Sequence, residues 1–174
     1  MTKTAFLFAG QGAQYLGMGR DLYDHYPIVK ETIDQASQVL GYDLRDLIDK
    51  DETKLNQTRY TQPAILATSV SIYRLLKEKG YQPDMVAGLS LGEYSALVAS
   101  GALDFEEAVA LVAKRGVYME EAAPAGSGKM VAVLNTPVDV IEEACKTASE
   151  VGIVTPANYN TPSQIVIGGE VAAV

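Results

Sequence analysis

A serine between two glycines is the first candidate for chemistry in this sequence. The stretch GLSLG, residues 88–92, follows a short apolar segment and precedes a segment of small residues. Where a strand turns sharply into a helix at Gly-x-Ser-x-Gly, the serine hydroxyl stands clear of the sheet and can act as a nucleophile. The glycines remove Cβ atoms that would collide with the strand or the helix. We therefore predict that Ser90 is a catalytic nucleophile, with a purely structural turn as the alternative.

Two main-chain N–H groups are candidates for binding the oxyanion that such a nucleophile would create. One belongs to Leu91, at the predicted start of a helix, where N–H groups have no partner within the helix. The other belongs to Gln11 in GQGAQ, a loop that follows a predicted strand. Tyr15 stands where a dinucleotide-binding glycine loop needs glycine, and no Gly-Lys-Ser/Thr follows for a Walker loop. The alternative for this loop is a tight turn at a strand end.

Composition narrows the classes of protein that fit this chain. The 174 residues are 48% hydrophobic and 21% charged, which is typical of a globular domain with a core. A net charge of −8 and a pI of 4.6 argue against nucleic-acid binding. Cys145 is the only cysteine, so no disulfide can form within the chain, as in a reducing compartment. No apolar run has the length of a membrane span, so we expect a cytoplasmic protein without a membrane partner.

Hydrophobic periodicity predicts the elements that must position these residues. Strands are predicted at 5–9 and 84–87, and helices at 21–40, 63–80, 92–100 and 105–122. Strands that alternate with helices favour a parallel α/β sheet. After the Gly-, Ala- and Pro-containing segment 123–129 the predicted order becomes β-α-β-β, the first part of a ferredoxin-like β-α-β-β-α-β unit.

Five segments, taken in order, resemble a known family. They are FLFAGQGAQYLGMGRDLY, YTQPAILATSV, GLSLGEYSALVASGAL, LVAKRGVYMEEA and ANYNTPSQIVIGG, and they cover essentially the whole chain. They are similar to the malonyl-CoA:acyl-carrier-protein transacylases of fatty acid synthesis, whose wider family includes acyltransferase domains of polyketide synthases. The resemblance implies that a malonyl group passes from coenzyme A to Ser90 as an ester, and then to the phosphopantetheine thiol of acyl carrier protein. It implies a monomer, and neither a metal nor a cofactor besides the coenzyme A thioester that is the substrate.

The resemblance also implies roles for further residues. The N–H groups of Gln11 and Leu91 would form the oxyanion hole. Arg115, in AKRGVYM, matches the family's arginine for the malonyl carboxylate, which a guanidinium can bind through two parallel hydrogen bonds. Met119 matches a position that lines the pocket, and Asn160 falls in a segment near the site. From spacing alone, Arg115 would instead be a surface arginine paired with a glutamate of its own helix.

The predicted order of elements indicates a division into two parts. We expect a parallel-sheet α/β-hydrolase-like acyltransferase subdomain at residues 1–125, which carries the nucleophile. We expect an incomplete, partial ferredoxin-like α+β subdomain at 126–174. Because the second unit is half-built and ends at Val174, we interpret the chain as a truncated N-terminal portion of a longer enzyme.

Two positions depart from the family's pattern. Leu89 stands where most members have a histidine before the nucleophile, which affects local packing and acyl preference. The family's base is a histidine well downstream of the nucleophile, whereas the only histidine here is His25, which precedes it. We do not expect His25 to be the base, so the chain by itself is expected to be poorly active or inactive.

Two other functions remain open at this point. The first is a serine esterase or thioesterase, which would share the same serine corner. The second is a non-catalytic module that binds the carrier protein, because the base histidine is absent. The carrier is expected to be acidic, as this chain is, so docking would need a local basic patch such as one near Lys114 or Lys129.

Overall fold

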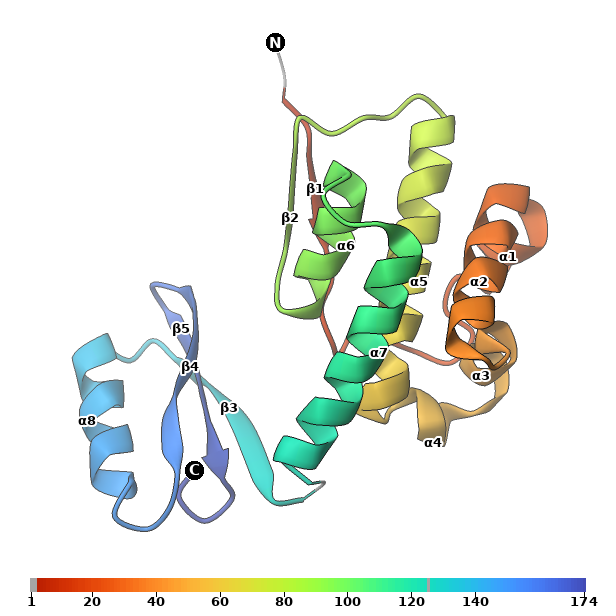
Figure 1. Cartoon of the computed structure of the whole chain (residues 1–174). Helices are drawn as coiled ribbons and strands as arrows, with labels where there is room; N and C mark the ends of the chain where they lie inside the picture. Colours follow the sequence, from red (N-terminus) through yellow and green to blue (C-terminus); the bar gives the residue numbers. More distant parts are fainter. Residues whose placement is uncertain (1–2, 125) are drawn as a thin grey trace. The chain divides into compact units, whose positions relative to one another are not determined.

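The computed structural model describes residues 3–124 and 126–174 and contains one parallel and one antiparallel sheet (Figure 1). The chain divides into two compact units, Met1–Met119 and Glu120–Val174. Parallel strands with helices in the first unit and a small antiparallel sheet in the second confirm the predicted fold class. The predicted boundary at 125–126 falls on Ala125, which lies outside the described residues, so it stays a prediction.

The first unit contains two strands and most of the helices that the structure describes. In chain order they are β1 (Ala5–Phe8), α1 (Arg20–His25), α2 (Pro27–Leu40), α3 (Leu44–Lys50), α4 (Glu52–Leu55), α5 (Thr58–Glu78), β2 (Met85–Gly88), α6 (Leu91–Ser100) and α7 (Phe105–Ala122), whose last three residues belong to the second unit. Strands β1 and β2 are parallel, with Phe8 opposite Gly88. Because parallel strands end at the same edge, the loops that follow them leave the sheet side by side.

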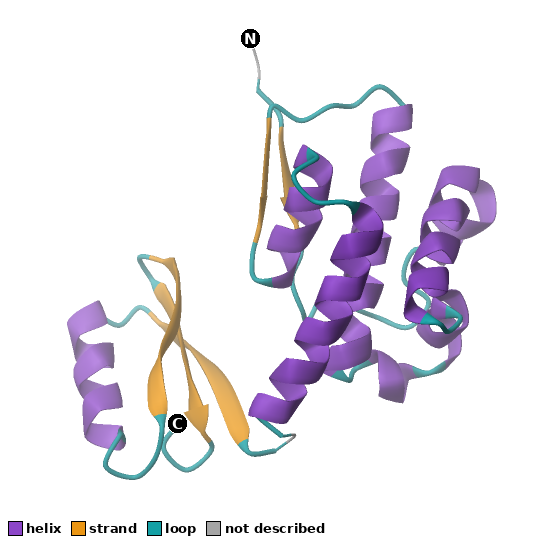
Figure 2. Ribbon diagram, in the orientation of Figure 1, coloured by secondary structure: helices purple, strands orange, loops and turns teal. Residues whose placement is uncertain are grey.

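Helix α6 packs against both strands and against α5, so the helices cover one face of this sheet (Figure 2). On that face Phe6 and Phe8 meet the ring of Tyr73 edge-on. The other face is open among the described residues, and Leu7 is 79% exposed there. The strand at 5–9, which its apolar run predicts to be buried, is therefore buried on one side only.

The predicted single helix at 21–40 is wrong, because the structure breaks it at Tyr26. That residue has extended backbone angles, with φ −125° and ψ 113°, and it separates α1 from α2. The cause is Pro27, whose ring disfavours the α conformation for the residue before it. Pro27 itself is the first residue of α2, where its missing N–H costs nothing.

Helix α5 begins earlier than its sequence pattern predicts. Pro63 was expected to open this helix, but the helix starts at Thr58 and Pro63 lies inside it. Pro63 has no N–H to donate to the carbonyl of Arg59, and the helix tolerates this loss one turn from its end. The additional first turn matters for the site, because it places Thr61 and Gln62 on the buried side of the helix.

One apolar core holds the first unit together around α5. Its fully buried side chains come from α2 to α7 and include Ile33, Leu44, Ile48, Leu66 and Val109. Asp104 caps α7, since its side chain accepts hydrogen bonds from the N–H groups of Glu106 and Glu107. Packing and capping therefore fix the two helices, α5 and α7, that carry site residues.

The second unit contains β3 (Gly128–Leu134), α8 (Val138–Ala148), β4 (Val154–Thr161) and β5 (Gln164–Glu170). The strands are antiparallel in the order β3-β5-β4. Ile141 and Cys145 of α8 pack against Val154 and Ile165 of the sheet to form a small separate core. The predicted β-α-β-β order is confirmed. Within the described part of the chain, no helix is both long and apolar enough to cross a membrane.

Candidate active site

Ser90 lies at the corner between β2 and α6 and is exposed. Its backbone angles, φ 53° and ψ −106°, lie in a region that residues with a side chain rarely adopt. Strain of this kind persists only where the surrounding structure enforces it, and it concentrates at functional sites. The geometry is therefore the sharp strand-to-helix turn that the Gly-x-Ser-x-Gly spacing predicts.

The two glycines beside Ser90 allow backbone segments to approach closely. A Cβ on Gly88 would lie 2.0 Å from the carbonyl carbon of Gly92. A Cβ on Gly92 would lie 2.1 Å from the carbonyl oxygen of Phe8. No side chain fits at either position, so both glycines are needed for the end of β2, the start of α6 and the end of β1 to meet.

The two candidate oxyanion donors lie on the loops that leave this edge of the sheet. Leu91 is the first residue of α6, so its N–H has no acceptor within the helix. A Cβ on Gly10 would lie 2.7 Å from the carbonyl oxygen of Leu89, which shows that the loop after β1 touches the serine corner. Among residues 3–124 and 126–174, no protein atom accepts a hydrogen bond from the Gln11 main-chain N–H. The role of both groups as an oxyanion hole stays a prediction.

Arg115 contacts Ser90 directly. Its Nη2 donates a hydrogen bond to Ser90 Oγ at 3.0 Å, and its Nη1 donates to Gln62 Oε1 at 2.8 Å. The guanidinium carbon also lies 5.5 Å from the centroid of the Tyr94 ring, a cation–π contact. Within the described residues no carboxylate forms a salt bridge with Arg115. A cation without an anionic partner thus lies beside the candidate nucleophile.

Gln62 links Arg115 to two other predicted site residues, and sequence reasoning missed it. Its Nε2 donates to Met119 Sδ at 3.1 Å and lies 3.4 Å from Gln11 Oε1. The residue is 0% exposed. It was missed because the helix was expected to begin at Pro63. A helix begun at Thr58 would have placed Gln62 on the apolar face, where a polar residue needs an explanation.

The remaining predicted residues are placed as follows. Met119, at the end of the first unit, is 42% exposed and accepts the hydrogen bond from Gln62 through its sulfur. Leu89, next to Ser90, is 57% exposed. Asn160 lies on β4 in the second unit, where its Nδ2 donates to Gln164 Oε1 at 3.0 Å. The substrate-binding roles of Arg115, Met119 and Asn160 stay predictions.

His25 is not placed to act as a base on Ser90. It is the last residue of α1, and its Nδ1 lies 2.6 Å from the carbonyl oxygen of Asp21. Since a carbonyl can only accept, Nδ1 carries the proton. Among the residues that the structure describes, Ser90 Oγ has a hydrogen bond from Arg115 and none with His25. The described residues also contain no group of three or more acidic, His or Cys side chains that could hold a metal.

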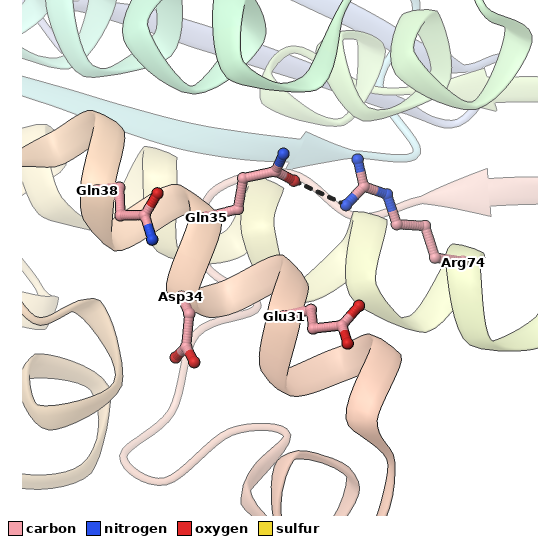
Figure 3. A pocket seen from close by; sticks show the side chains of 5 residues that line it. All are labelled: Glu31, Asp34, Gln35, Gln38 and Arg74. Atoms are coloured by element: carbon pink, nitrogen blue, oxygen red, sulfur yellow. Dashed lines mark hydrogen bonds between the residues drawn. The ribbon is translucent and has the colours of Figure 1, made fainter.

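A polar hollow elsewhere in the first unit is not part of this site. It lies over α2 and α5 and is lined by Glu31, Asp34, Gln35, Gln38 and Arg74 (Figure 3). Arg74 Nη1 donates to Gln35 Oε1 at 3.0 Å, and Gln35 Nε2 donates to Glu106 Oε1 at 2.8 Å. Burial lowers the pKa of Arg74 from its usual value. These contacts join α2, α5 and α7, so we interpret the hollow as part of a structural network.

The chain is similar to known proteins over almost its whole length. A family model described as "Acyl transferase domain" matches residues 5–174. The chain is 51% identical over 177 residues to the malonyl CoA-acyl carrier protein transacylase of Haemophilus influenzae, and 48% identical over 176 residues to that of Escherichia coli strain K12. Each alignment covers 100% of this chain and 57% of the relative, so the chain spans little more than half the length of these relatives.

Solved structures agree with the sequence relatives. A crystal structure of MCAT from Streptococcus pneumoniae superposes with a TM-score of 0.94 at 88% identity, covering 98% of this chain and 56% of that one. A malonyl-transacylase in complex with its type II PKS acyl-carrier protein gives a TM-score of 0.93 at 48% identity, covering 99% of this chain and 55% of that one. With a strained serine corner, the Arg115 guanidinium beside it and a family model that matches 5–174, the chain belongs to the acyl transferase domain family.

Proposed function

We propose that the protein that carries this chain transfers a malonyl group from coenzyme A to the phosphopantetheine thiol of acyl carrier protein, in fatty acid biosynthesis. The observation that carries the proposal is the 3.0 Å contact between Arg115 Nη2 and Ser90 Oγ, made by a guanidinium with no salt-bridge partner among the described residues. Relatives named malonyl CoA-acyl carrier protein transacylase support it.

The first half-reaction forms an ester. Ser90 Oγ attacks the thioester carbonyl, and its proton passes to a general base, a role for which no described residue is placed. The N–H groups of Gln11 and Leu91 hold the tetrahedral oxyanion, and losing one such donor costs about 3 kcal/mol of transition-state stabilisation. The intermediate collapses, the C–S bond breaks, and the coenzyme A thiolate takes up a proton. In the second half-reaction the carrier's thiol attacks the malonyl ester, and Ser90 recovers its proton.

Arg115 explains why the acyl group would be a diacid monothioester. The free carboxylate of a malonyl group can accept two parallel hydrogen bonds from a guanidinium, in place of the single bond to Ser90 Oγ. An acetyl group offers no such acceptor, so the half-buried cation would stay unpaired at a cost in free energy. Malonyl transfer should therefore be favoured over acetyl transfer.

We also infer that the protein works as a cytoplasmic monomer, with no cofactor besides its thioester substrate and no nucleic-acid partner. This inference rests on the family, on the acidic composition and on the single cysteine. For carrier docking, Lys114 and Lys129 are both exposed cations. Reversing their charge should raise the KM for carrier protein and leave acylation by malonyl-CoA unchanged. Size-exclusion chromatography with light scattering tests the monomer.

The test of the proposed function is an acylation assay on the protein that carries this chain. Incubation with malonyl-CoA should add the mass of one malonyl group, and peptide mapping should locate it on Ser90. The Ser90→Ala variant should remain unlabelled, and acyl carrier protein should discharge the label. Rapid hydrolysis that needs no acceptor would indicate an esterase or thioesterase instead. A protein that binds carrier but never forms the ester would be a non-catalytic binding module.

A further inference from the structure

We infer that Gln62 is a positioning residue that makes the site select acyl groups with a free carboxylate. This inference rests on the proposed function, because it concerns the same site and the same thioester. Gln62 touches no reacting atom. It acts through Arg115, whose Nη1 donates a hydrogen bond to Gln62 Oε1 at 2.8 Å. Gln62 lies in the first turns of α5, and it is 53 residues before Arg115 in the chain.

The contacts of the buried amide fix its orientation. Gln62 Oε1 accepts from Arg115, and Nε2 faces Met119 Sδ at 3.1 Å and Gln11 Oε1 at 3.4 Å. A flipped amide would turn two N–H donors toward a guanidinium that can only donate, so the oxygen must face Arg115. One acceptor and both donors of the side chain are thus used, and a residue that is 0% exposed is fully satisfied.

The neutrality of Gln62 is what leaves the charge of Arg115 available. A second arginine of the same unit is instead paired with a carboxylate. Arg45 is buried and donates two hydrogen bonds to Asp49, of 2.5 Å from Nη2 and 3.0 Å from Nε. Asp49 compensates the charge of Arg45. Under Arg115 the fold instead places an amide, which orients the guanidinium without neutralising it. The positive charge is left for a ligand beside Ser90.

The backbone around Gln62 is built for this contact. A Cβ on Gly116 would lie 2.7 Å from the Cα of Arg59, so α7 approaches the first turn of α5 more closely than any other residue at 116 would permit. The same turn of α5 also holds the loop after β1, because Gln11 Nε2 donates to Thr58 Oγ1 at 3.1 Å. Gln62 therefore connects the arginine to the loop that carries a predicted oxyanion donor.

Two substitutions separate the charge of Gln62 from its packing. Gln62→Glu supplies Arg115 with a carboxylate in the same place. It should lower kcat/KM for malonyl-CoA by roughly 100-fold and change that for acetyl-CoA by less than about threefold. Gln62→Met keeps the length and neutrality but removes the acceptor. It should lower kcat/KM for malonyl-CoA by about tenfold, mainly through KM, with acetyl-CoA unchanged.

Binding of free malonate, measured by calorimetry on the protein that carries this chain, is a second readout that needs no chemistry. Its affinity should fall in the order wild type, Gln62→Met, Gln62→Glu. Gln38→Glu is the matched control, because it adds the same charge at an exposed position of α2, and it should leave every value unchanged. Far-UV circular dichroism checks that the variants fold. If Gln62→Glu does not fold, the ratio of malonyl to acetyl kcat/KM in Gln62→Met decides the question.

The outcomes separate this inference from the proposed function. Equal losses for malonyl-CoA and acetyl-CoA in either variant would mean that Gln62 is merely structural, and so would an unchanged malonyl rate in Gln62→Glu. Both results overturn the inference and leave the proposed function standing. A wild-type protein that forms no malonyl ester overturns the proposed function. In that case malonate binding that Gln62→Glu abolishes still supports the role of Gln62, and a wild type that does not bind malonate overturns both.

Discussion

At the scale of single residues, the backbone conformation of Ser90 is the feature that the surrounding structure fixes most tightly. Its positive φ is maintained because Gly88, Gly92 and the end of β1 leave no room for another path of the backbone. Acyl transfer needs a nucleophile and main-chain donors for the oxyanion, and Ser90 with the N–H groups of Gln11 and Leu91 are the candidates, beside a guanidinium that has no salt-bridge partner among the described residues. All of these groups belong to the first unit.

The glycines of the serine corner should not tolerate even one methyl group. Gly92→Ala puts a Cβ 2.1 Å from the carbonyl oxygen of Phe8, which forces the backbone apart. We expect a loss of about 3 kcal/mol or more in the free energy of unfolding, together with loss of ester formation on Ser90. Urea unfolding and the acylation assay measure both. Gly128→Ala is the control, since its Cβ would meet its nearest atom at 3.4 Å; a Gly92→Ala variant as stable and active as this control would contradict the argument.

Arg115 should control which acyl group is accepted. Arg115→Ala removes the only hydrogen bond to Ser90 Oγ within the described residues, and with it the cation for a free carboxylate. We expect kcat/KM for malonyl-CoA to fall by about 100-fold or more, while acetyl-CoA is accepted as well as before or better. Lys77→Ala, which removes an exposed positive charge from α5, is the control. Parallel losses for both thioesters would show that Arg115 supports the fold rather than the substrate.

At the scale of elements, helix α5 supports the candidate site. The short helix before it, α4, depends on its N-terminal cap. Thr58 and Gln62 in its first turns hold Gln11 and Arg115, and α6 and α2 pack along its length. Asp51 caps the preceding helix, α4, by accepting a hydrogen bond from the N–H of Lys54 at 2.9 Å. A capping carboxylate ties the stability of that helix to pH.

The cap of α4 predicts a pH dependence with a definite sign. The Lys54 N–H, and then its ammonium group, lower the pKa of the Asp51 carboxyl below its usual value. A lowered folded-state pKa means that this stabilisation is complete above the unfolded pKa of about 3.9 and is lost as pH falls through the folded value. Asp51→Asn keeps the cap but does not titrate. The urea midpoint of the wild type should therefore fall toward that of Asp51→Asn below about pH 4. A difference between the two midpoints that stays constant down to about pH 3 would refute the role of the Asp51 carboxylate in this pH dependence.

At the scale of the whole chain, two cores with no residue in common hold the two units. Ile141, in the smaller core of the second unit, is 4% exposed, and Leu66, in the larger core, is 0% exposed. Ile141→Ala should cost about 2 to 5 kcal/mol of local stability and should increase amide hydrogen exchange in β3, β4 and β5, but not in α5. Leu66→Ala should increase amide hydrogen exchange in α5 but not in β3, β4 and β5. Exchange that rises equally in both units after either change would show that they unfold together.

Several features of this chain could be predicted from sequence because their causes are local. The corner at Ser90, the cap at Asp104 and the β-α-β-β order of elements in the second unit each depend on residues a few positions apart or on short apolar runs. The two wrong helix limits have a local cause too, since the effect of a proline depends on where in the helix it lies. Pro27 ends one helix and opens another, whereas Pro63 lies inside α5.

The amino-acid sequence alone determined that a serine would stand strained between a strand and a helix, because steric exclusion by neighbouring residues acts over only a few bonds. Only the tertiary structure decided what Ser90 faces. Arg115 lies 25 residues after Ser90, and Gln62 lies 53 residues before Arg115, yet packing of α7 on the first turn of α5 brings all three together. Contacts of that kind depend on the volumes of many side chains at once, and no spacing within one segment encodes them.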